Sequence, residues 1–203
     1  MNIQFLNFFI GSVFFFSMPV FAQQFETGDI IFQTSKSAQS VVIQKATHSP
    51  YSHMGMIVKK QGKLWVLEAI QPVKYTALKQ WINRGEKGQY VVKRYYKALS
   101  VAQQNQLVKS AEKYLGKPYD LYFEWDDQAI YCSEIVWKAY TNALRIELSP
   151  LQHLKDFDLK DAQVKSLMKT RYGAHIPLQE TVIAPKAIFD SKLLISVRAD
   201  RNF

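Results

Sequence analysis

The hydrophobic period of the chain changes near residue 100, and this change constrains the fold more than any other feature. Before it, short runs rich in Val, Ile and aromatic residues are typical of strands. Four such runs occur, at 25–32, 52–59, 63–70 and 90–96. After it, apolar residues recur at helical spacing in 100–115 and 132–144, which predicts two helices. Strands and helices that are partly segregated along the chain predict an α+β domain.

Shorter signals complete the expected elements. Residues 37–46 have helical spacing after serines that can cap a helix, so a short helix is expected there. A polar turn containing Gly62 separates the second and third strand runs, which predicts a β-hairpin. A last strand is expected at 193–197. The rest of the chain after residue 150 shows no readable organisation.

The two longer helices have clear apolar faces. Ser100 is a good cap for the first, and Gly116 followed by Pro118 ends it. Its shared face is formed by Val101, Leu107, Val108, Ala111 and Leu115. The inner face of the second is formed by Ile135, Val136, Tyr140 and Leu144.

The N-terminus has the form of a secretory signal. Residues 5–21 are almost uniformly apolar, and Val20 and Ala22 provide a small-residue cleavage site. Cleavage after Ala22 would make 1–22 a signal peptide and leave 23–203 as the mature chain. We therefore expect a periplasmic or secreted protein, and a retained membrane anchor is the alternative.

The mature chain of about 180 residues is long enough for one well-cored domain. It shows no internal repeat. The whole sequence contains a single cysteine, Cys132, which cannot form an intramolecular disulfide. This cysteine is therefore a buried filler, half of an intermolecular bridge or a reactive thiol.

The chain is basic, with a formal net charge of +9. A basic balance attracts anionic partners such as lipid head groups or acidic wall polymers, so peripheral contact with an anionic surface is one reading. The other reading is ordinary solvated charge, because the lysines lie near turns and strand ends. No helix has a continuous basic face and no nucleic-acid motif occurs, so we expect no nucleic-acid partner.

Cys132 lies where a thiol can become a nucleophile. The helical pattern begins at or just after it, and the free backbone N–H groups of a helix start favour negative charge. A neighbouring imidazole is the second common device for activating a thiol. Since a lone cysteine at an element boundary is more often structural, its partners decide the interpretation.

His53 and Glu68 are the best partners for Cys132. They lie on the two strands of the expected hairpin, and a turn about residues 60 and 61 places them directly opposite each other. An imidazole is a suitable partner for a carboxylate in an apolar strand. The alternatives are a structural His53, an edge-strand Glu68 that reaches solvent, and a zinc site from both with His48. The spacing matches no compact metal motif, and His153 and His175 show no flanking pattern.

These residues resemble a known family. The segments 116–120 (GKPYD) and 131–137 (YCSEIVW) resemble the NlpC/P60 cysteine peptidases. Here the histidine precedes the cysteine, the order of the circularly permuted papain-like branch, and the similarity is greatest to its YiiX/YebB-like group. The segments 28–31 (GDII) and 51–53 (YSH) also match that group.

The resemblance implies a permuted papain-like NlpC/P60 fold, with an antiparallel sheet packed against helices. It implies Cys132 as nucleophile, His53 as general base and Glu68 as the residue that orients His53. Tyr119 matches a tyrosine that donates to the oxyanion, and Tyr51 competes for this role.

Amide hydrolysis in cell-wall peptide is the activity that the resemblance implies. Two alternatives are acyl transfer or hydrolysis on lipids, as in lecithin retinol acyltransferase-like proteins, and a non-catalytic protein that binds the cell envelope. No cofactor is expected.

Overall fold

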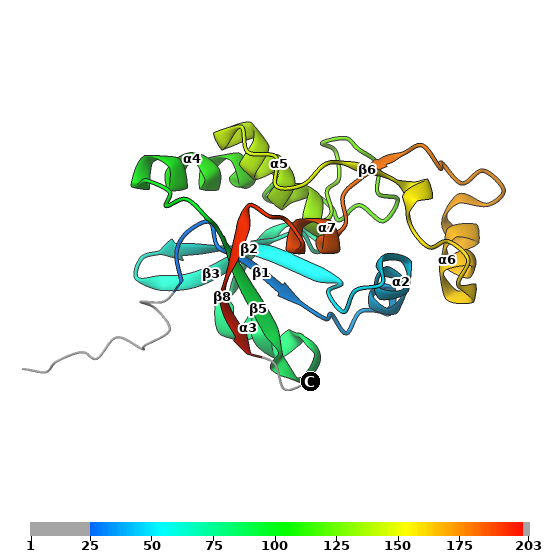
Figure 1. Ribbon diagram of the computed structural model, residues 1–203, viewed down its shortest axis with the longest axis horizontal. Coiled ribbons are helices and arrows are strands. Elements are labelled where there is room, and N and C mark those ends of the chain that lie inside the picture. The colour runs from blue at the N-terminus through cyan, green and yellow to red at the C-terminus, as the bar shows by residue number, and fades with distance from the viewer. Residues whose placement is uncertain (1–24, 201–203) are drawn as a thin grey trace, which may run out of the picture.

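The computed structural model describes residues 25–200, and the expected signal peptide lies outside them. An antiparallel sheet with the strand order β4-β3-β2-β1-β5-β8 forms its centre (Figure 1). Its strands are β1 (Ile30–Gln33), β2 (His53–Lys60), β3 (Lys63–Glu68), β4 (Lys74–Ala77), β5 (Tyr90–Tyr95) and β8 (Leu194–Asp200). A second, two-stranded sheet pairs β6 (Gln152–His153) with β7 (Thr181–Val182).

Helices lie over both faces of the large sheet and beside it (Figure 1). They are α2 (Ala38–Thr47), α3 (Leu78–Arg84), α4 (Val101–Glu112), α5 (Cys132–Leu144), α6 (Ala162–Tyr172) and α7 (Pro185–Phe189). Short 3-10 turns occupy Glu86–Gly88 and Leu154–Asp156. Within residues 25–200, none of the helices has the length and apolar character needed to cross a bilayer.

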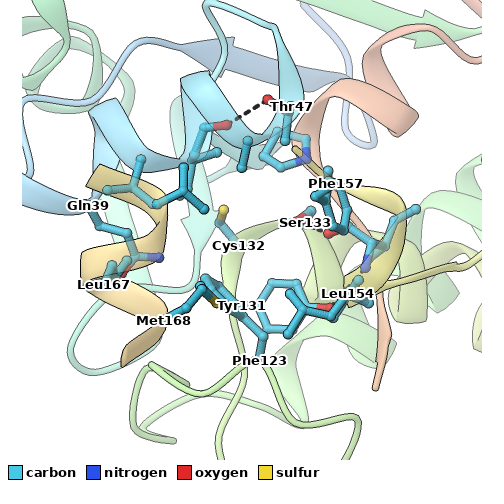
Figure 2. Close-up of a pocket in the computed structure, with 18 of the residues that line it drawn as sticks. Gln39, Thr47, Phe123, Tyr131, Cys132, Ser133, Leu154, Phe157, Leu167 and Met168 are labelled. Atoms are coloured by element: carbon cyan, nitrogen blue, oxygen red, sulfur yellow. Dashed lines mark hydrogen bonds between the residues drawn. The ribbon is translucent and has the colours of Figure 1, made fainter. Parts of the chain in front are cut away.

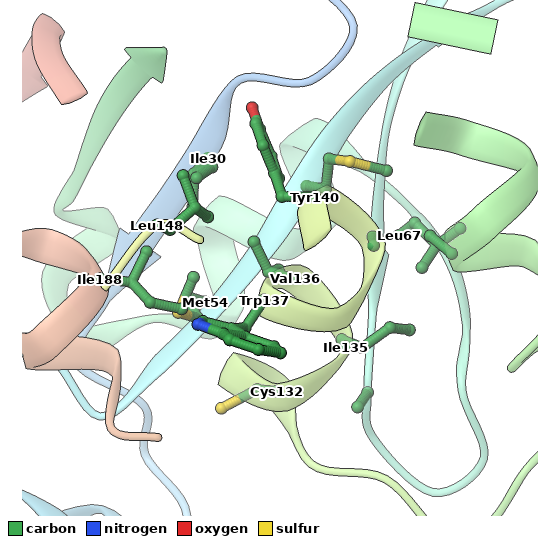
Figure 3. Close-up of a cluster of buried hydrophobic side chains, with 14 of the residues drawn as sticks. Ile30, Met54, Leu67, Cys132, Ile135, Val136, Trp137, Tyr140, Leu148 and Ile188 are labelled. Atoms are coloured by element: carbon green, nitrogen blue, oxygen red, sulfur yellow. The ribbon is translucent and has the colours of Figure 1, made fainter. Parts of the chain in front are cut away.

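Alternation along β2 divides the core into two layers. Met54, Met56 and Val58 pack with α5 on one face, whereas Ile57 packs with Trp81 of α3 on the other. Figure 1 shows α4 and α5 over one face of the sheet and α3 against the other. The first turn of α5, which carries Cys132, lies at the edge of the larger cluster (Figure 3).

The β2–β3 hairpin has a register different from the expected one. Its turn consists of Gln61 and Gly62, both with positive φ, and the ladder pairs Met56 with Leu67. Continuing this ladder sets Glu68 opposite Gly55 rather than opposite His53, so the expected direct pairing is wrong. Because the difference is two residues, His53 and Glu68 still lie on the same face.

The two long helices differ in how well their faces were predicted. In α4, Leu107 and Ala111 are buried, but Val101 in the first turn is 73% exposed. The helix ends at Glu112, before Leu115, so the expected face is too long at both ends. In α5, every residue from Cys132 to Tyr140 is buried, since the helix is covered on all sides and not only on its inner face.

The tail after residue 150 forms an ordered layer. Apolar residues of α6 pack against α2, with Val164 and Met168 contacting Val42 and Ala46. The last expected strand is confirmed as β8, which pairs with β5. The tail therefore contributes a wall beside the first turn of α5 as well as an edge strand of the sheet.

Candidate active site

The first turn of α5 holds Cys132, which is 2% exposed. The backbone N–H of Tyr131, just before the helix, donates to Oε2 of Glu134 at 3.2 Å. This bond fixes the start of the helix, as an acidic residue in the first turn commonly does. The N–H of Cys132 itself belongs to the group of donors at a helix start that no helical carbonyl can satisfy.

His53 and Glu68 are in direct contact. Nε2 of His53 lies 2.6 Å from Oε2 of Glu68, and the two side chains are on the face of the sheet that carries α3. The ring of His53 also stacks on Trp81, with 5.9 Å between the ring centroids. Because Nε2 is engaged by the carboxylate, Nδ1 is the ring nitrogen that remains for another partner.

Glu68 is fully buried, and polar groups surround its carboxylate. Thr76 donates to Oε1 at 2.6 Å, Trp81 Nε1 donates to Oε2 at 2.9 Å, and the guanidinium of Arg84 forms an ion pair with Oε2. Since β3 lies inside the sheet between β2 and β4, the alternative of a solvent-exposed edge charge is wrong. A buried carboxylate with four partners is a rigid anchor for the imidazole.

The charges of the site perturb one another. Burial alone would lower the pKa of His53, but hydrogen bonds and negative charge from Cys132 and Glu68 outweigh it and raise the pKa to about 9. Burial alone would raise the pKa of Glu68, yet the hydrogen bond and charge of His53, with help from Thr76 and Arg84, lower it to about 2. At neutral pH, Glu68 is therefore ionised and His53 carries a proton.

The structure brings Cys132, His53 and Glu68 into one chain of contacts. Cys132 acts on His53 both as a hydrogen-bond partner and as a charge, so the thiol lies beside the imidazole. It acts in the same two ways on Tyr119. Burial and the adjacent Cys132 raise the pKa of Tyr119 well above its ordinary value, and the phenol therefore keeps its proton.

Tyr51, the other expected tyrosine, lies in a different environment. Its ring stacks on Phe189 with 4.2 Å between centroids and meets Phe32 edge-on. These contacts place Tyr51 in the core cluster around β1 and α7. Tyr119, the first of the two expected tyrosines, is in hydrogen-bond contact with Cys132.

The tail is bonded to the turn that carries the cysteine. Ser133 Oγ donates to the carbonyl of Ile183 at 2.6 Å, and the N–H of Ile183 donates to the hydroxyl of Tyr131 at 3.0 Å. The residues on either side of Cys132 are thus held by one residue of the tail. Sequence patterns gave no sign of this contact, because Ser133 and Ile183 are 50 residues apart.

A pocket with a volume of about 80 Å³ opens beside Cys132. Its walls come from α2, from α6, from the loop at 119–123 and from tail residues 182–185 (Figure 2). Most of the lining side chains are apolar, among them Val42, Ile43, Val164, Leu167, Met168 and Ile183. Figure 2 shows the sulfur of Cys132 in the middle of this ring of side chains.

The remaining histidines lie apart from this arrangement. His48 ends α2 and pairs with Asp158 at 3.2 Å, so it does not join His53 and Glu68 as the zinc alternative requires. His153 bonds to the carbonyl of Gln179, and His175 is exposed. Over residues 25–200, no three His, Cys, Asp or Glu side chains are grouped so that they could hold a metal ion.

Trp81 and Arg84 were not predicted as site residues, although a signal for α3 exists. Leu78, Trp81 and Ile82 have helical spacing, and Leu78 and Trp81 are buried. The segment is only seven residues long, too short for periodicity alone to separate a helix from a loop. Its role beside Glu68 follows from the sheet order, which joins β3 to β4 just before α3.

Comparisons with known proteins cover both the sheet and the tail. Residues 24–197 match the family described as permuted papain-like amidase enzyme, YaeF/YiiX, C92 family. The uncharacterized protein YiiX of Escherichia coli strain K12 is 56% identical over 181 residues, which cover 89% of this chain and 90% of YiiX. A crystal structure described as metalloprotein yiiX from Escherichia coli O157:H7 has a TM-score of 0.86 and 54% identity, covering 88% of this chain and 99% of that one.

Proposed function

Because the chain belongs to the permuted papain-like amidase family, we propose that it is a cysteine amidase with Cys132 as nucleophile, His53 as acid and base, and Glu68 as the residue that orients His53. One observation carries the proposal. The buried imidazole of His53 interacts with the thiol on one side and with an ionised carboxylate on the other. This is the order of contacts that a nucleophile, base and orienting group require.

Acylation begins from a sulfur whose proton has passed to His53. The sulfur attacks the amide carbon, a C–S bond forms, and the carbonyl electron pair moves to oxygen. His53 then gives its proton to the amide nitrogen as the C–N bond breaks. The products of this step are a thioester on Cys132 and a free amine.

Deacylation reverses the proton path. His53, now neutral, takes a proton from water, and the oxygen attacks the thioester carbon. The C–S bond breaks, and the sulfur leaves with its electron pair beside the protonated imidazole. A carboxylic acid is released, and Cys132 and His53 return to their starting state.

In both steps the carbonyl oxygen of the substrate becomes negatively charged, and hydrogen-bond donors must stabilise it. We propose the backbone N–H of Cys132 and the hydroxyl of Tyr119 for this role. The high pKa of Tyr119 supports the choice, because a phenol that keeps its proton can donate throughout the cycle. Tyr51 remains the less favoured candidate, since its ring packs against Phe189 and Phe32.

The related crystal structure is described as that of a metalloprotein, but the residues here do not suit a resident metal ion. Glu68 already bonds to Thr76, Trp81 and His53, and it pairs with the cation of Arg84. The positive charge of the Arg84 guanidinium disfavours a second cation on the same carboxylate. No step of the proposed reaction is therefore routed through a metal ion.

The substrate and the location are further parts of the proposal. Export through the expected signal at 1–22 would place the enzyme in the periplasm or outside the cell, where wall-peptide amides and lipid-type acyl groups are both available. Mass spectrometry of the mature protein tests export, since cleavage after Ala22 leaves Gln23 as the first residue. Incubation with defined wall peptides and phospholipids, with products identified by mass, tests the substrate.

Alkylation by iodoacetamide at neutral pH tests the catalytic proposal against a non-catalytic binding protein. We expect fast labelling of Cys132, together with a large loss of rate in the variant His53→Ala. The matched control is His175→Ala, which removes an exposed histidine and should label like the parent protein. Slow labelling that does not depend on His53 would overturn the proposal.

A further inference from the structure

Lys138 is a buried cation on the helix that carries Cys132. It lies further along α5 and is only 8% exposed. Its Nζ lies 2.6 Å from the carbonyl oxygen of Asp126, 2.8 Å from Oδ1 of Asp127 and 2.7 Å from Oε1 of Glu134. An ammonium carries three N–H donors, so each of them has a partner here. A buried ammonium that uses all its donors holds the groups it joins in fixed positions.

The ammonium of Lys138 keeps its charge in this position. Burial alone would lower the pKa of Lys138, but hydrogen bonds to Asp127 and Glu134 outweigh it and raise the pKa. The hydrogen bond from Lys138 in turn lowers the pKa of Asp127. The ammonium also lies over the ring of Trp125, 4.8 Å from its centroid. Lys138 and Asp127 therefore form an ion pair at neutral pH.

These contacts hold the segment 127–131 at both of its ends. At its start, Asp127 is bonded to Lys138 directly. At its end, the N–H of Tyr131 donates to Oε2 of Glu134, and the other oxygen of this carboxyl group contacts Lys138. One ammonium thus ties the segment to the first turn of α5.

The backbone on either side of Tyr119 is bonded to the same segment. The N–H of Ile130 donates to the carbonyl of Pro118 at 3.1 Å, and the carbonyl of Ile130 accepts from the N–H of Asp120 at 3.2 Å. Tyr119 lies between these two bonds and forms a parallel bridge with Ile130. A displacement of the segment would therefore move the tyrosine relative to the thiol.

We propose that Lys138 is a positioning residue of this enzyme, which fixes the hydroxyl of Tyr119 beside the sulfur of Cys132. It acts through the segment 127–131 and has no donor left for a substrate. This inference rests on the proposed function, in which Tyr119 donates to the oxyanion. Such a donor stabilises the transition state only at hydrogen-bond distance, so a displaced Tyr119 lowers kcat more than it changes KM.

Two substitutions release the segment from opposite sides. Lys138→Met keeps an unbranched side chain and removes the ammonium, and Asp127→Ala removes an acceptor whose side chain is 65% exposed. With an acyl p-nitroanilide we expect kcat to fall about 10²-fold in the first and about ten-fold in the second, with KM changed by less than about two-fold. Asp127→Ala carries the test if Lys138→Met does not fold. Gln128→Ala removes the neighbouring exposed side chain and, as the matched control, should keep the parent kcat.

A double-mutant cycle with Tyr119→Phe separates positioning from a merely structural role. Tyr119→Phe should lower kcat by about 10²-fold on its own. In that background Asp127→Ala should cost less than about two-fold, because the hydroxyl that it displaces is already absent. A loss of about ten-fold that is the same with and without the hydroxyl would overturn the inference.

Iodoacetamide separates the inference from the proposed function, because the sulfur displaces iodide in a step that forms no oxyanion. Asp127→Ala should therefore be labelled at the parent rate. A slower rate would mean that the segment acts on the thiol, and it would overturn the inference and leave the amidase intact. An unchanged kcat in Tyr119→Phe would also overturn the inference and leave Cys132 and His53 in their roles. Slow labelling of the parent protein without dependence on His53 would overturn both.

Discussion

The two sides of Cys132 differ in how completely their polar groups are satisfied. Around Glu68, each carboxylate oxygen is bonded, and the partners come from β2, β4 and α3. Across the pocket, most of the lining is apolar, and Nε2 of Gln39 and Nη1 of Arg171 are buried without an acceptor in the described chain. The first region is complete without a ligand, and the second is not. The comparison teaches that the polar network around Glu68 and the apolar pocket are built from separate parts of the fold.

The variant His53→Ala separates the two regions most strongly. Loss of the imidazole should lower kcat/KM for an acyl p-nitroanilide by about 10⁴-fold or more, because acylation and deacylation both need its proton. Initial rates of the parent protein and the variant over a range of substrate concentrations measure the loss. Parent-like kcat/KM in the variant would remove His53 from the proposed role and leave the two regions without the expected difference.

Glu68→Gln tests the polar side alone. Removing the negative charge should lower kcat/KM by about 10²-fold and reduce the pKa of His53, so the alkaline decline in kcat/KM should move below its position near pH 9. A pH profile of turnover measures the shift. Glu86→Gln, at an exposed position, is the control and should keep the parent profile. An unmoved decline in the Glu68 variant would remove that carboxylate from the proposed role.

Gly55→Ala probes how closely the hairpin supports Glu68. A Cβ at residue 55 would lie 2.5 Å from Cγ1 of Val66 and 3.2 Å from Cβ of Glu68. We expect the free energy of unfolding to fall by about 1–3 kcal/mol, because the neighbouring strand must shift. Urea denaturation measures the change. Parent-like stability would mean that the strands yield easily and that Glu68 is held mainly by its hydrogen bonds.

The stability of the fold should depend on pH through the same pair. The raised pKa of His53 stabilises the folded state fully below pH 6.5, and this contribution is lost as pH rises towards about 9. The lowered pKa of Glu68 stabilises it fully above pH 4.5, and this contribution is lost as pH falls towards about 2. We expect each change to be on the order of 3 kcal/mol, measured by urea denaturation across the pH range. The double variant of His53 and Glu68 should lack both changes.

The sequence predicts the elements that carry Cys132, His53 and Glu68 well, because the patterns that indicate a helix or a strand are local in the sequence. The helix at 132–144 has the bounds that the pattern indicates, since apolar residues recur at helical spacing over its whole length. His53 and Glu68 were placed on one face by strand alternation. The error in their register came from the turn, which uses Gln61 and Gly62 instead of residues 60 and 61. A register shift by an even number of residues keeps each side chain on the same face of the sheet. His53 and Glu68 are therefore in contact although their expected direct pairing is wrong.

The apolar pocket could not be predicted from sequence patterns, because the segments that form it are short and far apart in the sequence. The strands β6 and β7 have two residues each, and no period can be recognised in so few. The helix α6 did carry signals, with Asp161 as its cap and Gly173 after its end. Nothing in those signals says that α6 packs on α2, a contact between residues more than a hundred positions apart. A pocket formed in this way depends on tertiary packing.

The two hydrogen bonds of Ile183 have a consequence for how the protein is made. A ribosome synthesises Cys132 and its helix first, and about fifty further residues must follow before Ile183 can bind Tyr131 and Ser133. The nascent chain therefore contains its thiol before it contains the segment that holds the adjoining residues and closes the pocket. The surroundings of Cys132 are therefore completed only after residue 183 has been added to the chain.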